Sequence, residues 1–142
     1  MPLEIVAYRA EFFEDVDRLW KEAFPDAPAR NQAAHSIVAK IAVQPELFLV
    51  ALDGPQVIGT VMAGYDGHRG WLHSVAVRRS HQRQGVGSAL VREAERRLLD
   101  LGCPKLNLQV MPGNAPVAAF YERLGFGVEE RISMGKVLSK RR

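Results

Sequence analysis

A chain of 142 residues can bury one hydrophobic core but is too short for two ordinary domains, so we expect a single domain over residues 1–142. Its composition, 47% hydrophobic and 25% charged, excludes a disordered chain, and its apolar runs are only strand-length, so we expect no membrane partner. The net charge of +3 is concentrated in part at Arg78, Arg79 and Arg83, a cluster that suits a small anion better than a nucleic-acid duplex.

The first part of the chain predicts one strand and two helices. Residues 3–8 have the pattern of a short strand, and residues 12–24 place apolar side chains at helical spacing on one face. Residues 31–43 predict a second, weaker helix that ends before Pro45. We expect its apolar stripe to consist of Ile37, Val38 and Ile41.

The middle of the chain predicts three strands. Residues 48–52 and 57–65 are rich in β-branched and apolar residues and flank an Asp-Gly-Pro turn, which predicts an antiparallel hairpin. Residues 71–77 form a third run of this kind and lead directly into a glycine-containing loop.

The last part of the chain predicts two helices and two strands. Residues 86–101 place apolar side chains on one face of a helix and charged side chains on the other, and a glycine follows directly. This pattern predicts an amphipathic helix. We expect strands at 106–110 and 131–138, and a helix at 114–124 between them. The basic tail at 140–142 is interpreted as a solvated end.

The loop between the third strand and the long helix suits a phosphate group. A helix N-terminus presents unpaired backbone N–H groups, and glycine at 85 and 87 lets an oxygen approach them. It is not a P-loop, because no Gly-Lys-Ser/Thr follows, and it is not the dinucleotide fingerprint, because Leu90 occupies the third glycine position. Two glycines alone are more typical of an ordinary tight turn than of a phosphate site.

A second motif follows the loop at a characteristic separation. The loop reads Gln82-x-x-Gly85-x-Gly87, and the later motif reads Asn114, then Phe120-Tyr121-Glu122, then Gly125-Phe126. Together they resemble the GNAT family of N-acetyltransferases. Residues 64–70, 102–105 and 133–136 further resemble the YpeA-type subgroup of small GNAT proteins. The resemblance spans nearly the whole chain.

This resemblance implies a fold, a cofactor and a set of site residues. The fold would be a single α/β domain of the α+β type, with a mixed, largely antiparallel central sheet flanked by helices. The cofactor would be acetyl-CoA, with a backbone N–H near Val75 polarising the thioester carbonyl and Tyr121 protonating the departing thiolate. The residues implied to bind the cofactor are Val75, Ala76, Val77, Gln82, Arg83, Gln84, Gly85, Val86, Gly87, Ser88 and Asn114.

Two of these roles have plain structural alternatives. Val117, Phe120 and Leu124 predict the apolar stripe of the last helix, and Tyr121 on its edge could be a buried tyrosine with a structural hydrogen bond. Asn114 is a good helix N-cap.

The general base is left open by the sequence. An amine must lose a proton to attack a thioester, and a carboxylate or an imidazole usually accepts it. Some relatives that acetylate protein N-termini carry glutamate where this chain has Gln109, which cannot act as a base. His73 on the third strand and Asp66 and His68 in the preceding loop have suitable chemistry, although a turn explains the loop pair equally well.

Other reactive side chains receive structural interpretations. Cys103 is the only cysteine, which excludes an intrachain disulfide and favours a reducing, cytoplasmic setting; we expect a packed thiol there. The histidines lack the spacing of metal ligands, so we expect no metal.

We therefore expect an acetyl-CoA-dependent N-acetyltransferase that modifies a primary amine of a small molecule, an amino acid or a peptide N-terminus, by direct attack in a ternary complex. The first two helices would form part of the acceptor wall through Trp20, Phe24, Asp26 and Arg30. A CoA-binding module without catalysis and, less favoured, a nucleic-acid-binding domain are the alternatives. A homodimer is left open.

Overall fold

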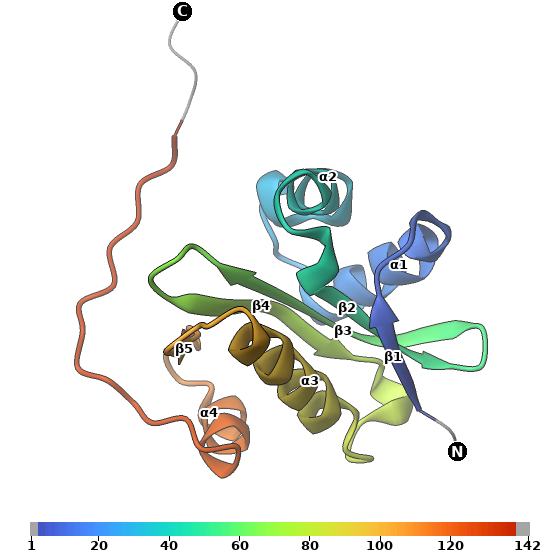
Figure 1. Ribbon diagram of the computed structural model, residues 1–142. Helices are drawn as coiled ribbons and strands as arrows, with labels where there is room; N and C mark the ends of the chain where they lie inside the picture. Colours follow the sequence, from blue (N-terminus) through green and yellow to red (C-terminus); the bar gives the residue numbers. More distant parts are fainter. Residues whose placement is uncertain (1–2, 139–142) are drawn as a thin grey trace, which may run out of the picture. The chain divides into compact units, whose positions relative to one another are not determined.

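The computed structural model describes residues 3–138 and comprises two compact units, Met1–Gln109 and Val110–Arg142. The basic tail at 140–142 lies outside the described residues. The first unit contains a five-stranded sheet with helices packed on it, and the second contains one α-helix (Figure 1).

The sheet has the strand order β1-β2-β3-β4-β5. Neighbouring strands are antiparallel except for the last pair, β4 and β5, which is parallel. This confirms the predicted mixed, largely antiparallel sheet. The strands are β1 (Glu4–Ala7), β2 (Phe48–Asp53), β3 (Gln56–Tyr65), β4 (Gly70–Val77) and β5 (Leu106–Asn107).

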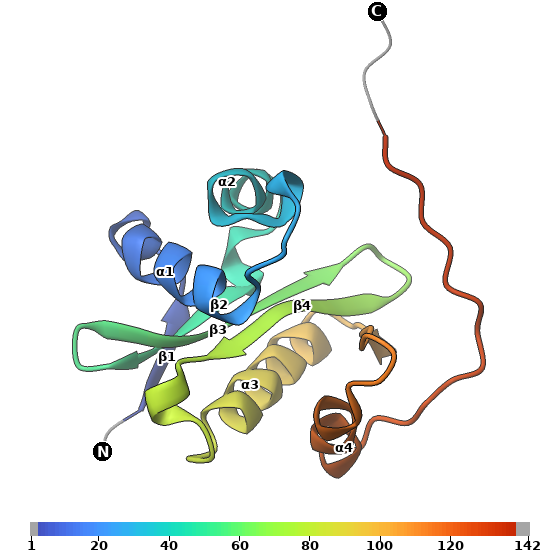
Figure 2. The ribbon, with the colours of Figure 1, turned by 180° about the vertical axis from the view of Figure 1, so that it is seen from behind.

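Helices cover both faces of this sheet. The helices α1 (Phe13–Ala23) and α2 (Ala33–Val43) lie on one face and α3 (Val86–Asp100) on the other, as Figures 1 and 2 show from opposite sides. Under α1, Trp20 packs against Phe48 with their ring centroids 5.8 Å apart. Short 3-10 turns complete the unit: η1 (Ala10–Phe12), η2 (Ala29–Asn31), η3 (Pro45–Leu47) and η4 (Arg79–His81).

The predicted apolar stripe of α2 is correct only at Ile37. Ile37 is buried, whereas Val38 and Ile41 are 68% and 45% exposed. The inward face of α2 carries the partly buried side chain of Lys40 in addition to its apolar ones, and the partly buried Gln44 follows as the C-cap of this helix. Gln44 both accepts a hydrogen bond from the Tyr65 N–H and donates one to the Tyr65 carbonyl, at 3.0 and 2.9 Å. The spacing of hydrophobic residues in a sequence does not predict hydrogen bonds of this kind.

Gly59 allows α3 to pack closely on β3. A methyl group at this position would lie 2.9 Å from Leu90 Cδ1, 3.2 Å from Val86 Cγ1 and 3.1 Å from the Ala76 carbonyl oxygen. The last of these is backbone and cannot rotate away. Gly59 therefore sets the distance between the first turn of α3 and the sheet.

We expect Gly59→Ala to lower the free energy of unfolding by about 1–3 kcal/mol, the usual cost of overpacking a core. Urea unfolding of the variant measures this loss. Gly64→Ala, in the same strand, is the matched control, because its methyl group would meet only Lys40 and Gln44 side-chain atoms, at 3.4 and 3.5 Å. Equal stability of the two variants would contradict the close-approach argument.

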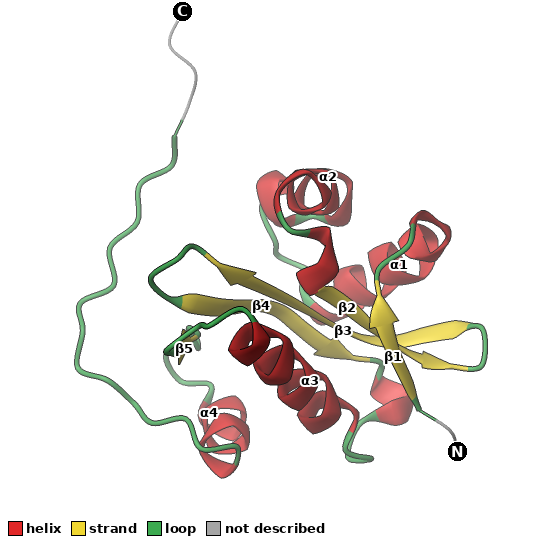
Figure 3. Ribbon diagram, in the orientation of Figure 1, coloured by secondary structure: helices red, strands yellow, loops and turns green. Residues whose placement is uncertain are grey.

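In the second unit, α4 (Ala115–Arg123) agrees with the helix predicted at 114–124. The strand predicted at 131–138 is wrong: these residues have no regular structure, and Figure 3 draws them as loop. Ile132, Met134 and Leu138 are 85–90% exposed, so no neighbouring strand receives their side chains within the described chain. β-propensity without a pairing partner does not make a strand. β5 is likewise shorter than the predicted 106–110.

Candidate functional site

The strand β4 carries a β-bulge close to its C-terminal end. Thr60 pairs with Ala76 and Met62 pairs with His73, so the single residue between them on β3 faces both Ser74 and Val75. Ser74 has φ of 52°, in the left-handed region that a residue with a side chain rarely adopts. A bulge redirects backbone groups that a regular ladder would occupy.

The opposite edge of β4 is open along most of its length. β5 pairs with β4 only at Gly70 and Trp71, and beyond that point no described strand pairs with this edge of residues 72–77. This stretch contains Val75, Ala76 and Val77, which the sequence predicts to bind the cofactor arm. An extended ligand with amide groups could add to such an edge as a further strand would.

The glycine-containing loop forms a concave backbone at the start of α3. Arg83 has φ of 65° and Gly85 has φ of 82°, both left-handed. Gly85 is the N-cap of α3, and no side chain caps this helix end. The free N–H groups of a helix N-terminus, next to residues that alternate between left-handed and right-handed backbone conformations, line a concavity that binds anions. The Val86 side chain is buried, so this residue offers only its backbone to the loop.

Two side-chain contacts hold the loop in place. Gln82 donates a hydrogen bond from Nε2 to the Val77 carbonyl at 3.2 Å, which ties the loop to the end of β4. His81 Nε2 lies 3.0 Å from an Asp53 carboxylate oxygen, and its Nδ1 lies 2.8 Å from Ser80 Oγ. This second contact joins η4 to the end of β2. The sequence does not reveal this contact, because Asp53 and His81 are far apart in the chain and Asp53 has the pattern of a turn residue.

Asp66 is a turn residue in the structure. Its Oδ1 accepts hydrogen bonds from the His68 and Arg69 N–H groups at 2.7 and 2.8 Å. These bonds, the Arg69 one foremost, lower the pKa of Asp66 below its ordinary value. A carboxylate stabilised in this way is a weakened base.

His73 has different surroundings. Its ladder partner Met62 belongs to the core beneath α1 and α2, so the His73 side chain projects on that face of the sheet. The His73 side chain is exposed at its surface, and partial desolvation by its neighbours, with secondly the charge of Lys40 on α2, lowers the pKa of His73 below its ordinary value. The Trp71 ring stacks beside it at a centroid distance of 6.5 Å. A lowered pKa favours the neutral imidazole, which is the form a base requires.

Within the second unit, Tyr121 lies at the centre of the buried side of α4. It is 9% exposed, whereas Val117 is 37% exposed, so the prediction that Tyr121 stands on the edge of the apolar stripe is wrong. The Phe120 and Phe126 rings contact Tyr121 edge-on at centroid distances of 4.9 and 5.6 Å. Burial raises the pKa of Tyr121 to about 12, so the phenol keeps its proton at neutral pH.

Asn114 occupies the N-cap position of α4 but does not cap it through its side chain. Its carbonyl accepts from the Ala118 N–H at 3.2 Å, as the first bond of the helix. Asn114 is therefore the N-cap residue by position, as the structural alternative predicts, but its side chain makes no capping hydrogen bond.

A model of the acetyltransferase (GNAT) family matches residues 9–126. The chain belongs to the GNAT family. A Yersinia pestis (strain Pestoides F) protein named as an acetyltransferase is similar to it, with 37% identity over 136 residues that cover 96% of each protein. The GNAT resemblance of the sequence is thus confirmed; its YpeA-type subgroup stays a prediction.

Solved structures place the GNAT chain in the same fold. Aminoglycoside acetyltransferase AAC(6')-Iy, solved with the bisubstrate analogue CoA-S-monomethyl-acetylneamine, matches with a TM-score of 0.77 at 20% identity, over 98% of this chain and 100% of that one. PaiA N-acetyltransferase of Thermoplasma acidophilum, solved with coenzyme A, matches with a TM-score of 0.80 at 21% identity, over 93% and 94%. Family and fold together confirm the predicted enzyme class, an acetyl-CoA-dependent N-acetyltransferase.

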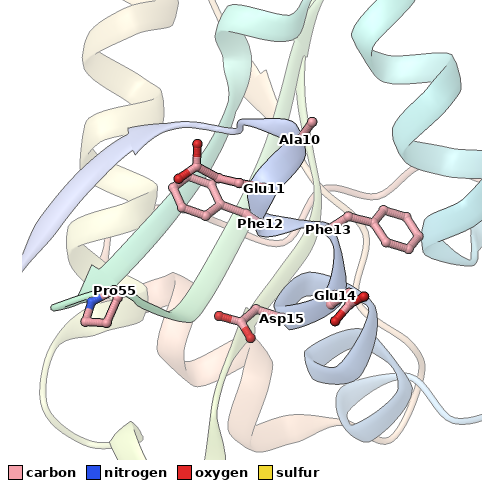
Figure 4. Close-up of a pocket in the computed structure, with 7 residues that line it drawn as sticks. All are labelled: Ala10, Glu11, Phe12, Phe13, Glu14, Asp15 and Pro55. Atoms are coloured by element: carbon pink, nitrogen blue, oxygen red, sulfur yellow. The ribbon is translucent and has the colours of Figure 1, made fainter.

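A hollow of about 480 Å³ opens elsewhere on this GNAT chain, at the start of α1 and the β2–β3 turn (Figure 4). Its lining includes three carboxylates, Glu11, Glu14 and Asp15, and none of the predicted cofactor residues. Asp15 accepts a hydrogen bond from the Val57 N–H at 3.0 Å. An acidic wall repels a pyrophosphate, so this hollow does not suit the cofactor.

Between residues 3 and 138, the GNAT chain contains no helix that is both long and apolar enough to cross a membrane. In the same range no three His, Cys, Asp or Glu side chains come together as a metal site would require.

Proposed function

We propose that this protein transfers the acetyl group of acetyl-CoA to a primary amine by direct attack in a ternary complex. The observation that carries the proposal is the continuity of the open β4 edge with the left-handed loop at the start of α3. An elongated ligand with an anionic end could follow both features without a break. Acetyl-CoA has this layout, with an amide-containing arm and a pyrophosphate.

The cofactor would bind mainly through backbone. The N–H groups of Arg83, Gln84, Gly85, Val86, Gly87 and Ser88 would hold the pyrophosphate, and Gln82 would fix the loop through its bond to Val77. The arm would pair with Val75, Ala76 and Val77 along the open edge. Asn114, whose side chain does not cap α4, would contact the arm.

The chemistry would proceed through attack of the neutral amine nitrogen on the thioester carbon. As the carbon–sulfur bond breaks, the excess proton of the amine passes to a base or to water, and sulfur receives a proton from Tyr121. A site that excludes water raises the pKa of the departing thiol as well as that of the phenol, which keeps this transfer feasible. Solvent then restores the proton to Tyr121.

We propose that both units form one catalytic domain over residues 1–142. The match to the family runs from residue 9 to 126 and so crosses the division between the units after Gln109.

The acceptor is proposed to be a small molecule, an amino acid or a peptide N-terminus. The solved relative AAC(6')-Iy holds an acetylneamine-containing bisubstrate analogue, which supports a small-molecule amine. Lys40 on the inner face of α2 and Gln44 directly after this helix could contact hydroxyl or carboxylate groups of such an acceptor.

A screen of acetyl-CoA consumption across amines, amino acids, polyamines and peptides tests this function, with free thiol as the readout. Turnover that requires one amine class supports the proposal. Calorimetric binding of CoA without turnover on any amine would indicate a CoA-binding module. Salt-dependent binding to DNA or RNA with no response to CoA would contradict the proposal.

We propose His73 as the base among the three candidates. We expect His73→Gln to lower kcat/KM at pH 7.5 about 10-fold, because water can carry part of the proton transfer. In the wild type, kcat/KM should fall as the pH drops through the lowered pKa of His73, since protonation removes the base. The pH–rate profiles of both proteins measure this.

The matched control is His35→Gln, which removes an exposed imidazole from α2. It should leave the profile unchanged. An acid limb that persists in His73→Gln would show that another group takes the proton.

A further inference from the structure

Thr60 is a polar residue in the core of the first unit. Its side chain is 0% exposed, and within residues 3–138 it is the one buried residue that is polar. A hydroxyl placed in a core costs stability unless both its donor and its acceptor capacity are used. The surroundings of Thr60 therefore indicate what the hydroxyl does.

The hydroxyl links α1 to the bulge of β4. Trp20 donates a hydrogen bond from Nε1 to Thr60 Oγ1 at 2.9 Å, and Thr60 Oγ1 donates to the Ser74 carbonyl at 2.8 Å. An indole N–H can only donate and a carbonyl can only accept. The direction of both bonds is therefore fixed, and the Thr60 proton must point at Ser74.

This carbonyl belongs to the strained residue of the bulge. Ser74 is left-handed at φ of 52° and has no partner in the ladder between β3 and β4. The Thr60 hydroxyl supplies the hydrogen bond that a regular β3 backbone N–H would have made. It thereby holds the peptide between Ser74 and Val75 in one orientation.

The orientation of that peptide decides where the Val75 N–H points. No described peptide bond is cis, and in a trans peptide the C=O and N–H bonds point in opposite directions. Because the Ser74 carbonyl points toward Thr60 on β3, the Val75 N–H points away from β3. That side is the open edge of β4, beyond the last pair with β5.

We propose that Thr60, oriented by Trp20, is a positioning residue that aims the Val75 N–H at the thioester carbonyl. The inference rests on the proposed acetyl transfer at this edge. The Val75 N–H would stabilise the negative charge that develops on the carbonyl oxygen, and such a donor acts only when it is held in place beforehand. Thr60 touches neither cofactor nor acceptor.

Thr60→Val and Thr60→Ser test the proposal in the full-length protein, with acetyl-CoA and the best amine from the screen. Valine keeps the shape and removes the hydroxyl. We expect Thr60→Val to lower kcat about 10- to 30-fold, less than the roughly 100-fold or more that complete loss of such a donor costs. The calorimetric Kd for CoA should change less than about 2-fold, because CoA has no thioester carbonyl to bind. KM for acetyl-CoA should change as little, because the charge on the carbonyl oxygen develops only in the transition state.

Two controls separate positioning from loss of stability. Thr60→Ser keeps the hydroxyl and should restore most of the kcat. Val16→Ala, in the same core beneath α1, is expected to lower Tm with kcat unchanged. The Val75 amide resonance gives a readout independent of turnover: acetyl-CoA should shift it in the wild type, and Thr60→Val should reduce that shift.

These experiments distinguish a wrong Thr60 inference from a wrong acetyltransferase proposal. If the wild type neither binds CoA nor consumes acetyl-CoA, the proposed function itself is wrong. If the wild type is active, the Thr60 inference is overturned by a Thr60→Val variant with wild-type kcat. A Thr60→Ser variant as slow as Thr60→Val would overturn it too.

Discussion

Replacing Tyr121 by phenylalanine is expected to lower kcat about 100- to 1000-fold, within the range for loss of a general acid. The phenylalanine ring can keep the edge-on contacts with Phe120 and Phe126, so packing is retained. The departing sulfur loses its proton donor. Because the pKa of Tyr121 is about 12, the wild-type phenol stays protonated to high pH, and its titration should produce no alkaline limb below about pH 10. Steady-state kinetics with acetyl-CoA and an accepted amine measure the loss.

Tyr8→Phe is the control for this substitution. Tyr8, in the first unit, stacks on Phe48 with their ring centroids 4.8 Å apart, so the change removes one hydroxyl from a packed ring and keeps the ring itself. Its kcat should match the wild type. A Tyr121→Phe enzyme with full turnover would remove Tyr121 from the mechanism and favour a water as the proton source.

Replacing Gly85 by valine is expected to weaken CoA binding about 100- to 1000-fold. Valine is strongly disfavoured at the φ of 82° that Gly85 adopts, so the loop must rearrange. Loss of two charge-assisted hydrogen bonds to the pyrophosphate, at about 1.5–3 kcal/mol each, accounts for a change of this size. Isothermal titration with CoA measures the affinity.

Gly102→Val is a closely matched control. Gly102 follows α3, has φ of 83°, and has open space around it just as Gly85 does. Both variants therefore carry the same backbone strain at opposite ends of α3. Similar losses of CoA affinity in the two would mean that general destabilisation, and not the loop, is responsible.

The helices and most strands could be predicted because their signals are local. The apolar spacing of residues 12–24 and 86–101 is a property of neighbouring residues, and α1 and α3 form there. The strand expected at 131–138 could not be judged locally, since a strand also needs a partner. The exposure of Val38 could not be foreseen either, because α2 turns polar side chains inward.

The parts of the candidate site that lie within short sequence motifs could be predicted from the sequence. The parts that depend on contacts between residues far apart in the chain could not. The glycines of the loop are visible in the sequence, and Gly85 is left-handed as such a loop requires. Trp20 and Thr60 are 40 residues apart, and the bulge that they support depends on the register of two strands. The pKa of His73 depends on Lys40 from another helix, which sequence spacing does not show.

Because the β4–β5 ladder ends after Trp71, the rest of the β4 edge bears on how readily the protein aggregates in the cell. An uncovered strand edge is a template on which other extended chains can add, and proteins usually protect such edges. In our proposal the cofactor arm covers this edge, so acetyl-CoA acts as a removable cap as well as a substrate. A ligand present at about 100 times its Kd stabilises a folded protein by about 2.7 kcal/mol. The supply of CoA would then govern how much of the protein escapes aggregation, in addition to how fast it works.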